Sequence, residues 1–588
     1  MNNFFRSFLA ALLALIVFSF IAGAIAIAGF TAVSSSMMSA KESPAGDNAV
    51  LLLDLSTHFP EVEPLNPLES ILGNENTHTP SLYDLLRMIG YARTDASIKG
   101  IYIKCESSSN DFASAEELRN ALIDFKSSGK FVIAYANVID QKAYYVANAA
   151  GKLYCHPTGG VEWHGFSLQM PFIKGALEKL EIEPQIFYAG KFKSATEPLR
   201  EYKMTDANKL QSNELLYDIY GQFLMKASQA RGIDTALLHR YADSNSITFA
   251  SQALKYKMVD GLRYDDEVKE EIKQLLKIEK EAQINFISPG KYAGSVGFKQ
   301  SGSQKIAVIY AEGNIVDGTG DRASIGGDTY RGYIRKARLD NTIKAIVVRI
   351  NSGGGSAMAS EVIWREVALA KKVKPVIVSF GDVAASGGYY MACAADSIFA
   401  QPNTITGSIG VFGVLPNLQK FFNNKLGVTF DEVHTSPDAN IMSVTRPLSP
   451  GQRKAIQDGV DTTYMQFKSR VAEGRNRTVI YIDSIAQGRV WSGSRAVALG
   501  LVDRIGGIGD AVIAAAAKAK LKDYRLTEYP EKPDIIDYFL KRKAESSKDA
   551  LIKEELGAEG YKTYSTIRNL KTFIGKVQAR IPFEISIQ

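Results

Sequence analysis

The chain alternates short apolar runs with longer stretches of helical character. Ile101-Tyr102-Ile103 and Phe131-Val132-Ile133-Ala134 are such runs in the first half, and Ile346-Val347-Val348 and Pro375-Val376-Ile377-Val378-Ser379 are their counterparts in the second half. A helix-like segment separates the two runs of each pair, and another follows the second run. Because strands that alternate with helices are typical of α/β domains, this pattern predicts largely parallel sheets.

The same pattern occurs twice along the chain. Residues 92–101 (ARTDASIKGI) match residues 337–346 (ARLDNTIKAI), and the same offset aligns Tyr144-Tyr145-Val146-Ala147 with Tyr389-Tyr390-Met391-Ala392. Such internal repeats indicate a duplicated domain. The predicted organisation is a first copy at residues 47–278, a polar linker at 279–304, a second copy at 305–520 and a charged helical tail at 521–588.

The N-terminal region contains a long apolar run without charge, from Phe8 to Val33. This run is long enough to cross the roughly 30 Å hydrocarbon layer as a helix. It therefore predicts a single-pass transmembrane anchor at residues 8–33, although the small residues of Ser36-Met37-Met38-Ser39-Ala40 leave cleavage open. Arg6 precedes the run, so the positive-inside rule places the remaining chain outside the cytoplasm.

Composition and charge narrow the class of partner. The chain has 69 basic and 63 acidic residues and a net charge of +6 over 588 residues. This weak excess gives no reason to expect nucleic acid binding and only mildly favours contact with anionic membrane lipid. The three cysteines, Cys105, Cys155 and Cys393, lack the spacing of a zinc site, so we expect no metal there. No cofactor is expected either.

A candidate nucleophile lies in a glycine-rich turn of the second copy. Residues 381–390 (GDVAASGGYY) follow a predicted strand and open a predicted helix, which places Ser386 at a helix N-terminus. The positive partial charge there favours a developing oxyanion, and the N–H of Gly387 can point at the oxygen of a substrate carbonyl. The alternative is a strand-to-helix turn with a capping serine.

A second glycine-rich turn precedes the first. Residues 349–356 (RINSGGGS) also follow a strand and precede a helix, and consecutive glycines can expose N–H groups to an anion or a carbonyl. Two such turns can face one crevice beyond the carboxyl ends of parallel strands. The alternatives are a phosphate-binding loop or a plain tight turn, and no Gly-Lys-Thr/Ser follows to indicate a nucleotide site.

The general base is predicted from the division of residues between the copies. A lysine in a desolvated setting can replace the histidine of a conventional triad, and Lys193 lies between Phe192 and small residues in the first copy. The duplication aligns Lys193 with a segment of the second copy that has no lysine, and it aligns Ser386 with a turn around Asp140 that has no serine. The two copies are therefore expected to form one composite site. Lys193 as a plain surface lysine and His434 as the base remain the alternatives.

The chain resembles the signal peptide peptidase A (protease IV) family in its long duplicated form. The segments that carry the resemblance are Ala384-Ala385-Ser386-Gly387-Gly388-Tyr389-Tyr390, Thr406-Gly407-Ser408-Ile409-Gly410, Asn351-Ser352-Gly353-Gly354-Gly355 and Lys193-Ser194-Ala195-Thr196-Glu197-Pro198. The resemblance implies two tandem crotonase/Clp-protease-like domains and a Ser/Lys dyad. In the dyad, Ser386 is the nucleophile and Lys193 the base, Ser408 orients the lysine, and Gly355 and Gly387 supply the oxyanion N–H groups.

The resemblance also implies a setting for this chemistry. It indicates a homotetramer at the inner (cytoplasmic) membrane, with the catalytic domains on the periplasmic side, that degrades cleaved signal peptides and similar apolar peptides. One position departs from the family pattern, which usually has proline where this chain has Gly353. Two other functions remain open: an acyl-CoA enzyme of the crotonase class and a catalytically silent scaffold.

Overall fold

The computed structural model describes residues 45–63, 79–296, 302–531 and 575–581, together with isolated positions between 5 and 21 and at 555 and 557. The predicted anchor, residues 8–33, lies outside the described residues apart from a few of those isolated positions. Among the described residues, no helix combines the length and the apolar character needed to cross a membrane. The anchor therefore stays a prediction from the sequence.

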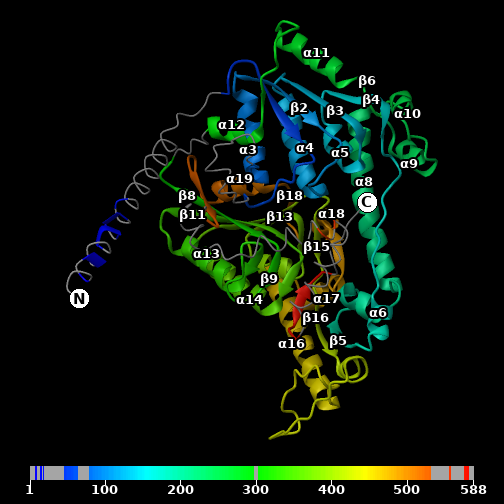
Figure 1. Ribbon diagram of the computed structural model, residues 1–588, viewed down its shortest axis with the longest axis vertical. Helices are drawn as coiled ribbons and strands as arrows, with labels where there is room; N and C mark the ends of the chain where they lie inside the picture. Colours follow the sequence, from blue (N-terminus) through cyan, green and yellow to red (C-terminus); the bar gives the residue numbers. More distant parts are fainter. Residues whose placement is uncertain are drawn as a thin grey trace.

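The first copy is built on a parallel sheet of six strands in the order β6-β4-β3-β2-β1-β7 (Figure 1). The strands are β1 (Ala49–Asp54), β2 (Ile98–Lys104), β3 (Phe131–Ile139), β4 (Lys152–Val161), β6 (Gly261–Leu262) and β7 (Phe286–Ile287). The helices α3 (Leu82–Thr94), α4 (Phe112–Lys126) and α5 (Gln141–Ala147) connect the first four strands. The predicted alternation of strands and helices is confirmed.

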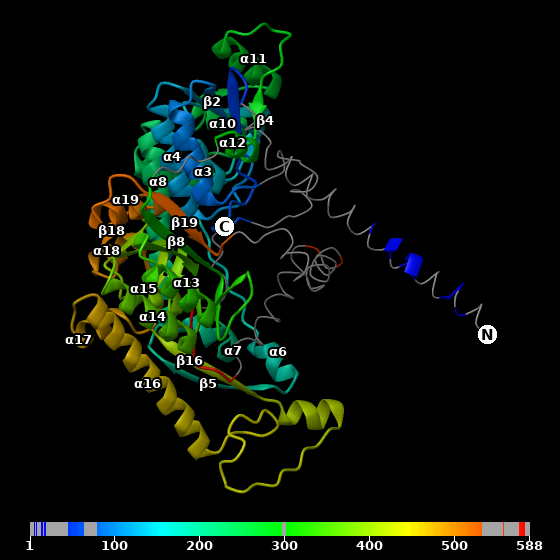
Figure 2. The same ribbon diagram turned by 90° about the vertical axis from the view of Figure 1, so that its left-hand side faces the viewer.

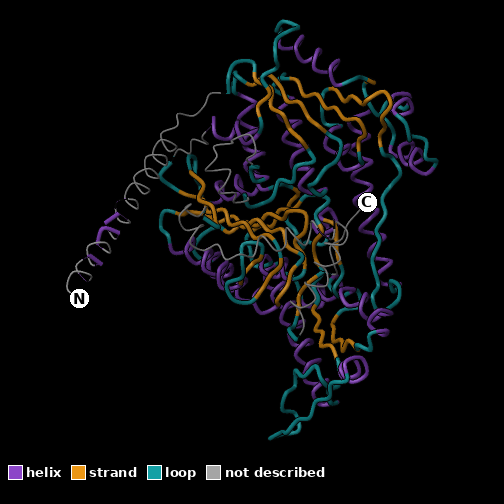
Figure 3. Tube along the Cα trace, viewed as in Figure 1, coloured by secondary structure: helices purple, strands orange, loops and turns teal. Residues whose placement is uncertain are grey.

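The second copy repeats this succession of elements. Its large sheet has the strand order β17-β15-β13-β11-β8-β19, with β14 and β18 branching from β13. The repeated elements are β8 (Lys305–Glu312), α13 (Gly327–Leu339), β11 (Ile343–Ser352), α14 (Ala357–Lys371), β13 (Val376–Ala385), α15 (Gly387–Ala392) and β14 (Ser397–Ala400). The remaining strands are β15 (Ile405–Gly407), β17 (Val490–Ser492), β18 (Arg504–Ile505) and β19 (Arg525–Tyr529). Figure 3 shows the large sheets of the two copies as separate layers.

Burial on both faces explains why the central strands are almost continuously apolar. In β8 and β11 nearly every side chain is buried, and the same holds for β2 and the first half of β3. Parallel strands covered by helices on both faces show this composition because no face meets water. The core of the first copy also includes Ala385, Ile405 and Val490 of the second copy, so the two copies share apolar contacts.

An arm of the first copy reaches the second copy and completes a third sheet (Figure 2). This mixed sheet has the order β10-β9-β12-β20-β16-β5, where β5 (Glu183–Ala189) comes from the first copy. Its other strands are β9 (Asn314–Val316), β10 (Ser324–Gly326), β12 (Gly354–Ser356), β16 (Val411–Asn417) and β20 (Gln578–Arg580). β5 pairs antiparallel with the whole length of β16. The helices α6 (Lys174–Lys179) and α7 (Glu197–Arg200) flank β5 in this arm, and α8 (Asp206–Arg231) leads the chain back to the first copy.

Two predicted segments differ from the structure. Residues 279–304, predicted to be a linker, contribute β7 and the helix α12 (Pro289–Val296) to the first copy. The hydroxyl of Tyr292 on α12 is buried and donates a hydrogen bond to Asp95 at 2.9 Å. The polar composition of this segment concealed the few apolar side chains, such as Ile287 and Tyr292, that fix it to the core.

The tail was predicted to be a charged helix at residues 521–588, and its two continuous described segments, residues 521–531 and 575–581, each contain a strand. β19 pairs in parallel with β8 at the edge of the large sheet, and β20 lies between β12 and β16. Strands of five and three residues are too short to give a clear alternating pattern. The long charged stretch between them therefore determined the prediction. Residues 532–574 and 582–588 are not described apart from positions 555 and 557.

Buried polar groups join the two copies. Asp382 on β13 accepts hydrogen bonds from the N–H groups of Ala113 and Ser114 at 3.0 and 2.9 Å, and so caps α4 of the first copy. Arg349 on β11 is fully buried and forms ion pairs with Glu61 at 2.8 Å and Glu117 at 2.7 Å, both from the first copy. These contacts orient the second-copy turn that follows β13 relative to the first copy.

Candidate active site

Ser386 lies at the junction of β13 and α15, at the carboxyl end of a strand inside the second large sheet. Its backbone has φ 54° and ψ −112°, and its side chain forms no capping hydrogen bond with α15. The N–H of Ser386 donates to the carbonyl of Gly407 at 2.8 Å, which holds this backbone in place. Positive φ is uncommon for a residue other than glycine and costs on the order of 1–3 kcal/mol. The surrounding structure therefore maintains a strained turn at the predicted nucleophile.

Lys193 of the first copy lies beside Ser386. The chain enters this position directly after β5, whose pairing with β16 carries it across to the second copy. The side chain of Lys193 is 1% exposed, and its Nζ lies 2.9 Å from Ser386 Oγ. Nζ is also 3.1 Å from Ser408 Oγ and 3.3 Å from the Ser408 carbonyl oxygen. The structure thus brings together three of the predicted site residues, from both copies.

Burial lowers the pKa of Lys193 well below its ordinary value of 10.5. Transfer of an ammonium group from water into a buried site is unfavourable, so the neutral amine is favoured. A neutral amine has two N–H groups and one lone pair. If the two N–H groups donate to the two oxygens of Ser408, the lone pair is left for the hydroxyl of Ser386. This arrangement can remove the proton from that hydroxyl.

Ser408 is held in a strained conformation by the segment that contains Gly488. Its φ is 49°, its N–H donates to the Arg489 carbonyl at 2.6 Å, and its Oγ lies 3.3 Å from the Gly488 carbonyl oxygen. The hydroxyl and the carbonyl of Ser408 both face Lys193 Nζ. The structure therefore places both oxygens of Ser408 beside the amine of Lys193, and the role of Ser408 in orienting that amine stays a prediction.

The glycine-rich turn adjoins Ser386. Gly354 has φ 99°, and a side-chain carbon on it would lie 2.1 Å from the Ala579 carbonyl oxygen and 2.7 Å from the Gly387 nitrogen. A side-chain carbon on Gly355 would lie 2.0 Å from the Ile315 carbonyl oxygen. Only glycine fits such close backbone approaches. The turn of β12 and the N–H of Gly387 therefore border the same small space, where the Ala579 carbonyl oxygen lies.

Two further residues of the site were not predicted from the sequence. Gly488, with φ 75°, packs so closely on Lys193 that an added side-chain carbon would lie 2.7 Å from Lys193 Cβ. Next to it, the Gln487 carbonyl accepts the N–H of Phe192 at 2.7 Å. These two residues fix the backbone that carries Lys193. No spacing or motif connects them with a lysine almost 300 positions earlier, so only the fold shows the contact.

His434, the alternative base, lies in a different environment. It belongs to the loop before α16 (Pro450–Gly474), and its Nε2 is 3.1 Å from the carboxylate of Glu432. The hydrogen bonds of Ser386 Oγ are to Lys193 and to the Gly410 carbonyl. The geometry therefore favours Lys193 as the base.

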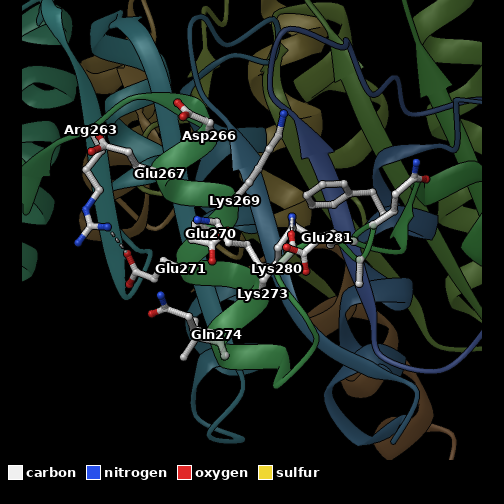
Figure 4. Close-up of a pocket in the computed structure, with 15 residues that line it drawn as sticks. Arg263, Asp266, Glu267, Lys269, Glu270, Glu271, Lys273, Gln274, Lys280 and Glu281 are labelled. Carbon is white, nitrogen blue, oxygen red and sulfur yellow. Dashed lines mark hydrogen bonds and ion pairs between the residues drawn. The ribbon is translucent and has the colours of Figure 1, made fainter.

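A surface hollow of about 1200 Å³ lies elsewhere, over α11 (Asp265–Leu276) of the first copy (Figure 4). Charged side chains of both signs line it, and Arg263 and Glu271 form an ion pair across 3.4 Å there. None of the predicted site residues lines this hollow. Its lining has no serine, threonine or cysteine beside a base. The candidate active site is therefore assigned to Ser386 and Lys193, although this hollow is large.

Comparison with known proteins places this site in a family. Residues 124–279 and 368–522 match the model described as Peptidase family S49. One matched segment lies in each copy, which confirms the duplication predicted from the sequence.

Curated relatives match over most of the chain. "Protease 4" of Salmonella typhi is 37% identical over 503 residues, which cover 83% of this chain and 81% of the relative. "Protease 4" of Haemophilus influenzae is 34% identical over 493 residues, covering 80% and 79%. "Serine protease SPPA, chloroplastic" of Arabidopsis thaliana is 34% identical over 440 residues, covering 73% and 64%. The resemblance found in the sequence is confirmed, and the chain belongs to peptidase family S49 as a serine protease.

Proposed function

We propose that this protein is a membrane-anchored endopeptidase with a Ser/Lys dyad, in which Ser386 is the nucleophile and Lys193 the general base. The observation that carries the proposal is the 2.9 Å contact between Lys193 Nζ and Ser386 Oγ in a fully buried setting. Burial favours the neutral amine, and only the neutral amine can accept a proton. Ser408 acts as the positioning residue for that amine.

The reaction follows from this geometry. Lys193 Nζ takes the proton of Ser386 Oγ, and Oγ attacks the carbonyl carbon of the substrate. The C–N bond then breaks, and the protonated Lys193 returns its proton to the leaving amine. Water attacks the resulting ester, Lys193 accepts its proton, and the acid product leaves while Ser386 regains its hydroxyl hydrogen. This is the general pattern of nucleophilic catalysis with an adjacent base.

The N–H groups of Gly355 and Gly387 stabilise the oxyanion of the intermediates. Both groups border the space beside Ser386, where the close packing around Gly354 places a carbonyl oxygen. Backbone N–H donors in a site that excludes water contribute most to such a step, because they need no reorganisation during the reaction. The glycine turn at 353–355 thus supplies one donor and the N-terminus of α15 the other.

The substrate class is proposed to be apolar, extended peptides such as the remnants of cleaved signal peptides. β12 and β16 both pair with the three-residue strand β20 beside the site, and an extended peptide can take the same place between them as a strand. The apolar run at residues 8–33 anchors the chain in the inner membrane with the catalytic copies on the periplasmic side. The crotonase/Clp-protease-like fold of each copy and a homotetrameric assembly belong to the same proposal.

Peptide hydrolysis by the detergent-solubilised full chain tests the proposal. The wild-type protein is expected to hydrolyse a fluorogenic apolar peptide and to be labelled at Ser386 by a fluorophosphonate probe. Ser386→Ala is expected to abolish both, because the nucleophile is lost while a small turn residue is kept. Retention of more than a small fraction of the turnover by Ser386→Ala would refute the nucleophile. An acyl-CoA enzyme or a silent scaffold would show neither hydrolysis nor labelling.

A further inference from the structure

Gln211 is a buried polar side chain of α8 that takes no part in the mechanism above. It is 3% exposed. Its amide nitrogen, Nε2, lies 3.1 Å from the carbonyl oxygen of Phe192 and 3.0 Å from Ser194 Oγ. These two residues directly precede and follow Lys193 in the chain. The amide of Gln211 therefore holds the loop of the proposed base on both sides of the lysine.

The oxygen of the same amide binds the second copy. Gln211 Oε1 accepts the N–H of Val490, the first residue of β17, at 3.3 Å. Val490 lies opposite Gly407 of β15, and the Gly407 carbonyl accepts the N–H of Ser386. The carbonyl of the residue before Val490 accepts the N–H of Ser408. One side chain thus joins the loop of the lysine to the strand pair that holds both serines.

The partners of Gln211 require an amide at this position. An amide oxygen can accept a hydrogen bond from a backbone N–H, and an amide nitrogen carries two N–H groups that donate to oxygens. A third acceptor, Asn208 Oδ1, lies 3.1 Å from Nε2, so two protons serve three oxygens. Asn208 is itself held by Glu197, to which its Nδ2 donates at 2.8 Å. An ionised carboxylate or an apolar side chain of the same length offers none of these donors.

The charged side chains of the neighbouring elements are engaged elsewhere. Glu197 of α7 accepts hydrogen bonds from the first turn of α8, and Arg489, which precedes β17, forms an ion pair with Glu214 of α8. Burial is what lowers the pKa of Lys193. The neutral amine therefore depends on how tightly its loop excludes water, and Gln211 fastens that loop.

We propose that Gln211 is a positioning residue of the peptidase reaction, which holds the Lys193 loop against β17 so that the amine stays shielded from water and directed at Ser386; this rests on the proposed function. The hydrogen bonds of Gln211 go to groups beside the dyad, so its effect passes through Lys193. Without the amide the loop can move and water can reach Nζ. A hydrated amine binds a proton more readily, and the base is then charged at neutral pH.

Rate profiles against pH, measured on the detergent-solubilised full chain with a fluorogenic apolar peptide, test the proposal. Gln211→Met keeps the length of the side chain and removes both ends of the amide. The apparent pKa of the rising limb is expected to increase by about one unit, which lowers kcat about tenfold at a pH below both values. KM is expected to stay within about twofold, since the side chain lies beside the dyad and contacts no substrate, and kcat should recover at higher pH.

A second variant and a control sharpen the measurement. Gln211→Glu is isosteric and keeps the acceptor for Val490, but it loses the donors and adds a carboxylate. Its apparent pKa is expected to rise at least as far, because a nearby negative charge favours the ammonium form. Gln229→Met replaces an exposed glutamine of the same helix and is expected to leave kcat, KM and the apparent pKa unchanged.

The results that overturn the inference are distinct from those that overturn the peptidase function. Rates are expressed per folded molecule, with the folded fraction taken from urea denaturation, and Gln211→Glu decides where Gln211→Met does not fold. A fall by the same factor at every pH, with an unchanged apparent pKa, would show that Gln211 supports the fold alone. Unchanged kcat and pKa in both variants would also contradict the inference and leave the dyad standing. A wild-type chain without hydrolysis contradicts the proposed function itself.

Discussion

In the first copy β3 enters α5 through Asp140, and in the second copy β13 enters α15 through Ser386. Asp140 has an ordinary extended backbone, with φ −71° and ψ 164°, and its carboxylate accepts the N–H of Ala143 at 2.6 Å. Ser386 has positive φ, gives no such cap, and turns its hydroxyl to Lys193 instead. The same strand-to-helix turn thus stabilises a helix in one copy and holds Ser386, the proposed nucleophile, in a strained conformation in the other.

The turns that follow β2 in the first copy and β11 in the second copy also differ in this way: one is filled by side chains and the other is not. At the end of β2 the side chain of Asn110 accepts the N–H of Phe59 at 3.0 Å and donates to its carbonyl at 2.8 Å, so polar side chains fill the turn. At the end of β11 the three glycines leave that space to backbone groups and to β20. The first copy therefore closes this turn with polar side chains and contributes Lys193, whereas the second copy has a glycine turn beside Ser386.

Substitution of Lys193 is expected to have the largest effect on activity, because Lys193 is the residue that the first copy contributes to the site. Lys193→Met removes the base but retains an apolar stem of similar length, and Lys193→Arg keeps a charge that does not titrate in the working range. Both variants are expected to lose peptide hydrolysis by about 10²–10⁴-fold, the usual contribution of a general base. Steady-state hydrolysis of a fluorogenic peptide measures this.

Lys191→Met is the matched control, because Lys191 lies two positions earlier and is exposed. It is expected to change the rate less than twofold. In the wild-type protein the rate should rise with pH through an apparent pKa well below about 10.4, since only the neutral amine accepts a proton. Normal turnover by Lys193→Met would show that the base lies elsewhere.

Sequence reasoning predicted those parts of the molecule that leave a local pattern. The buried parallel strands appear as apolar runs, and the duplication appears as repeated words such as those at 92–101 and 337–346. The residues Ser386, Lys193, Ser408, Gly355 and Gly387 were predicted from turns, from the unequal copies and from family resemblance. The structure brings all five into one place, while their roles in catalysis stay a prediction.

The parts that were not predicted depend on contacts between distant segments. Gly488 supports Lys193 only because the fold brings their backbones together, and a single glycine gives no sign of such a partner. β20 has three residues and lies in a charged tail, so its pairing with β12 has no periodic signal. Likewise, α12 was missed because two buried side chains fix an otherwise polar segment.

The contact between the copies is expected to depend most on Arg349. Arg349→Met leaves Glu61 and Glu117 buried without their cation, and burial already raises the pKa of Glu61 to about 8. Breaking a buried ion pair from one side typically destabilises a protein by about 3–5 kcal/mol. Urea denaturation measures the loss. Lys454→Met, which removes the exposed pair with Asp458, is the control and is expected to cost less than about 0.5 kcal/mol.

The buried lysine should also give the stability a specific pH dependence. The folded state holds Lys193 neutral, whereas the unfolded chain protonates it below pH about 10.4. Between the lowered pKa and that value the unfolded state binds one more proton, so stability rises with pH by about 1.4 kcal/mol per unit. In Lys193→Met this contribution to the pH dependence of the unfolding free energy is absent. The difference in unfolding free energy between the two proteins at pH 7, 8 and 9 isolates it, and equal slopes would show that Lys193 is charged in the folded protein.

The smallest effect, and the sharpest test of the comparison between the turns, is expected from Asp140→Ala beside Ser386→Ala. Asp140→Ala removes a helix cap from α5 and is expected to lower the unfolding free energy by about 1 kcal/mol while peptide hydrolysis is unchanged. Ser386→Ala removes a hydroxyl that caps nothing, so the unfolding free energy is expected to stay the same or rise while hydrolysis disappears. Denaturation and hydrolysis measured on both variants give opposite patterns if one turn serves stability and the other catalysis. A loss of stability in Ser386→Ala as large as that in Asp140→Ala would show that Ser386 also supports its helix, and the two turns would then differ in chemistry alone.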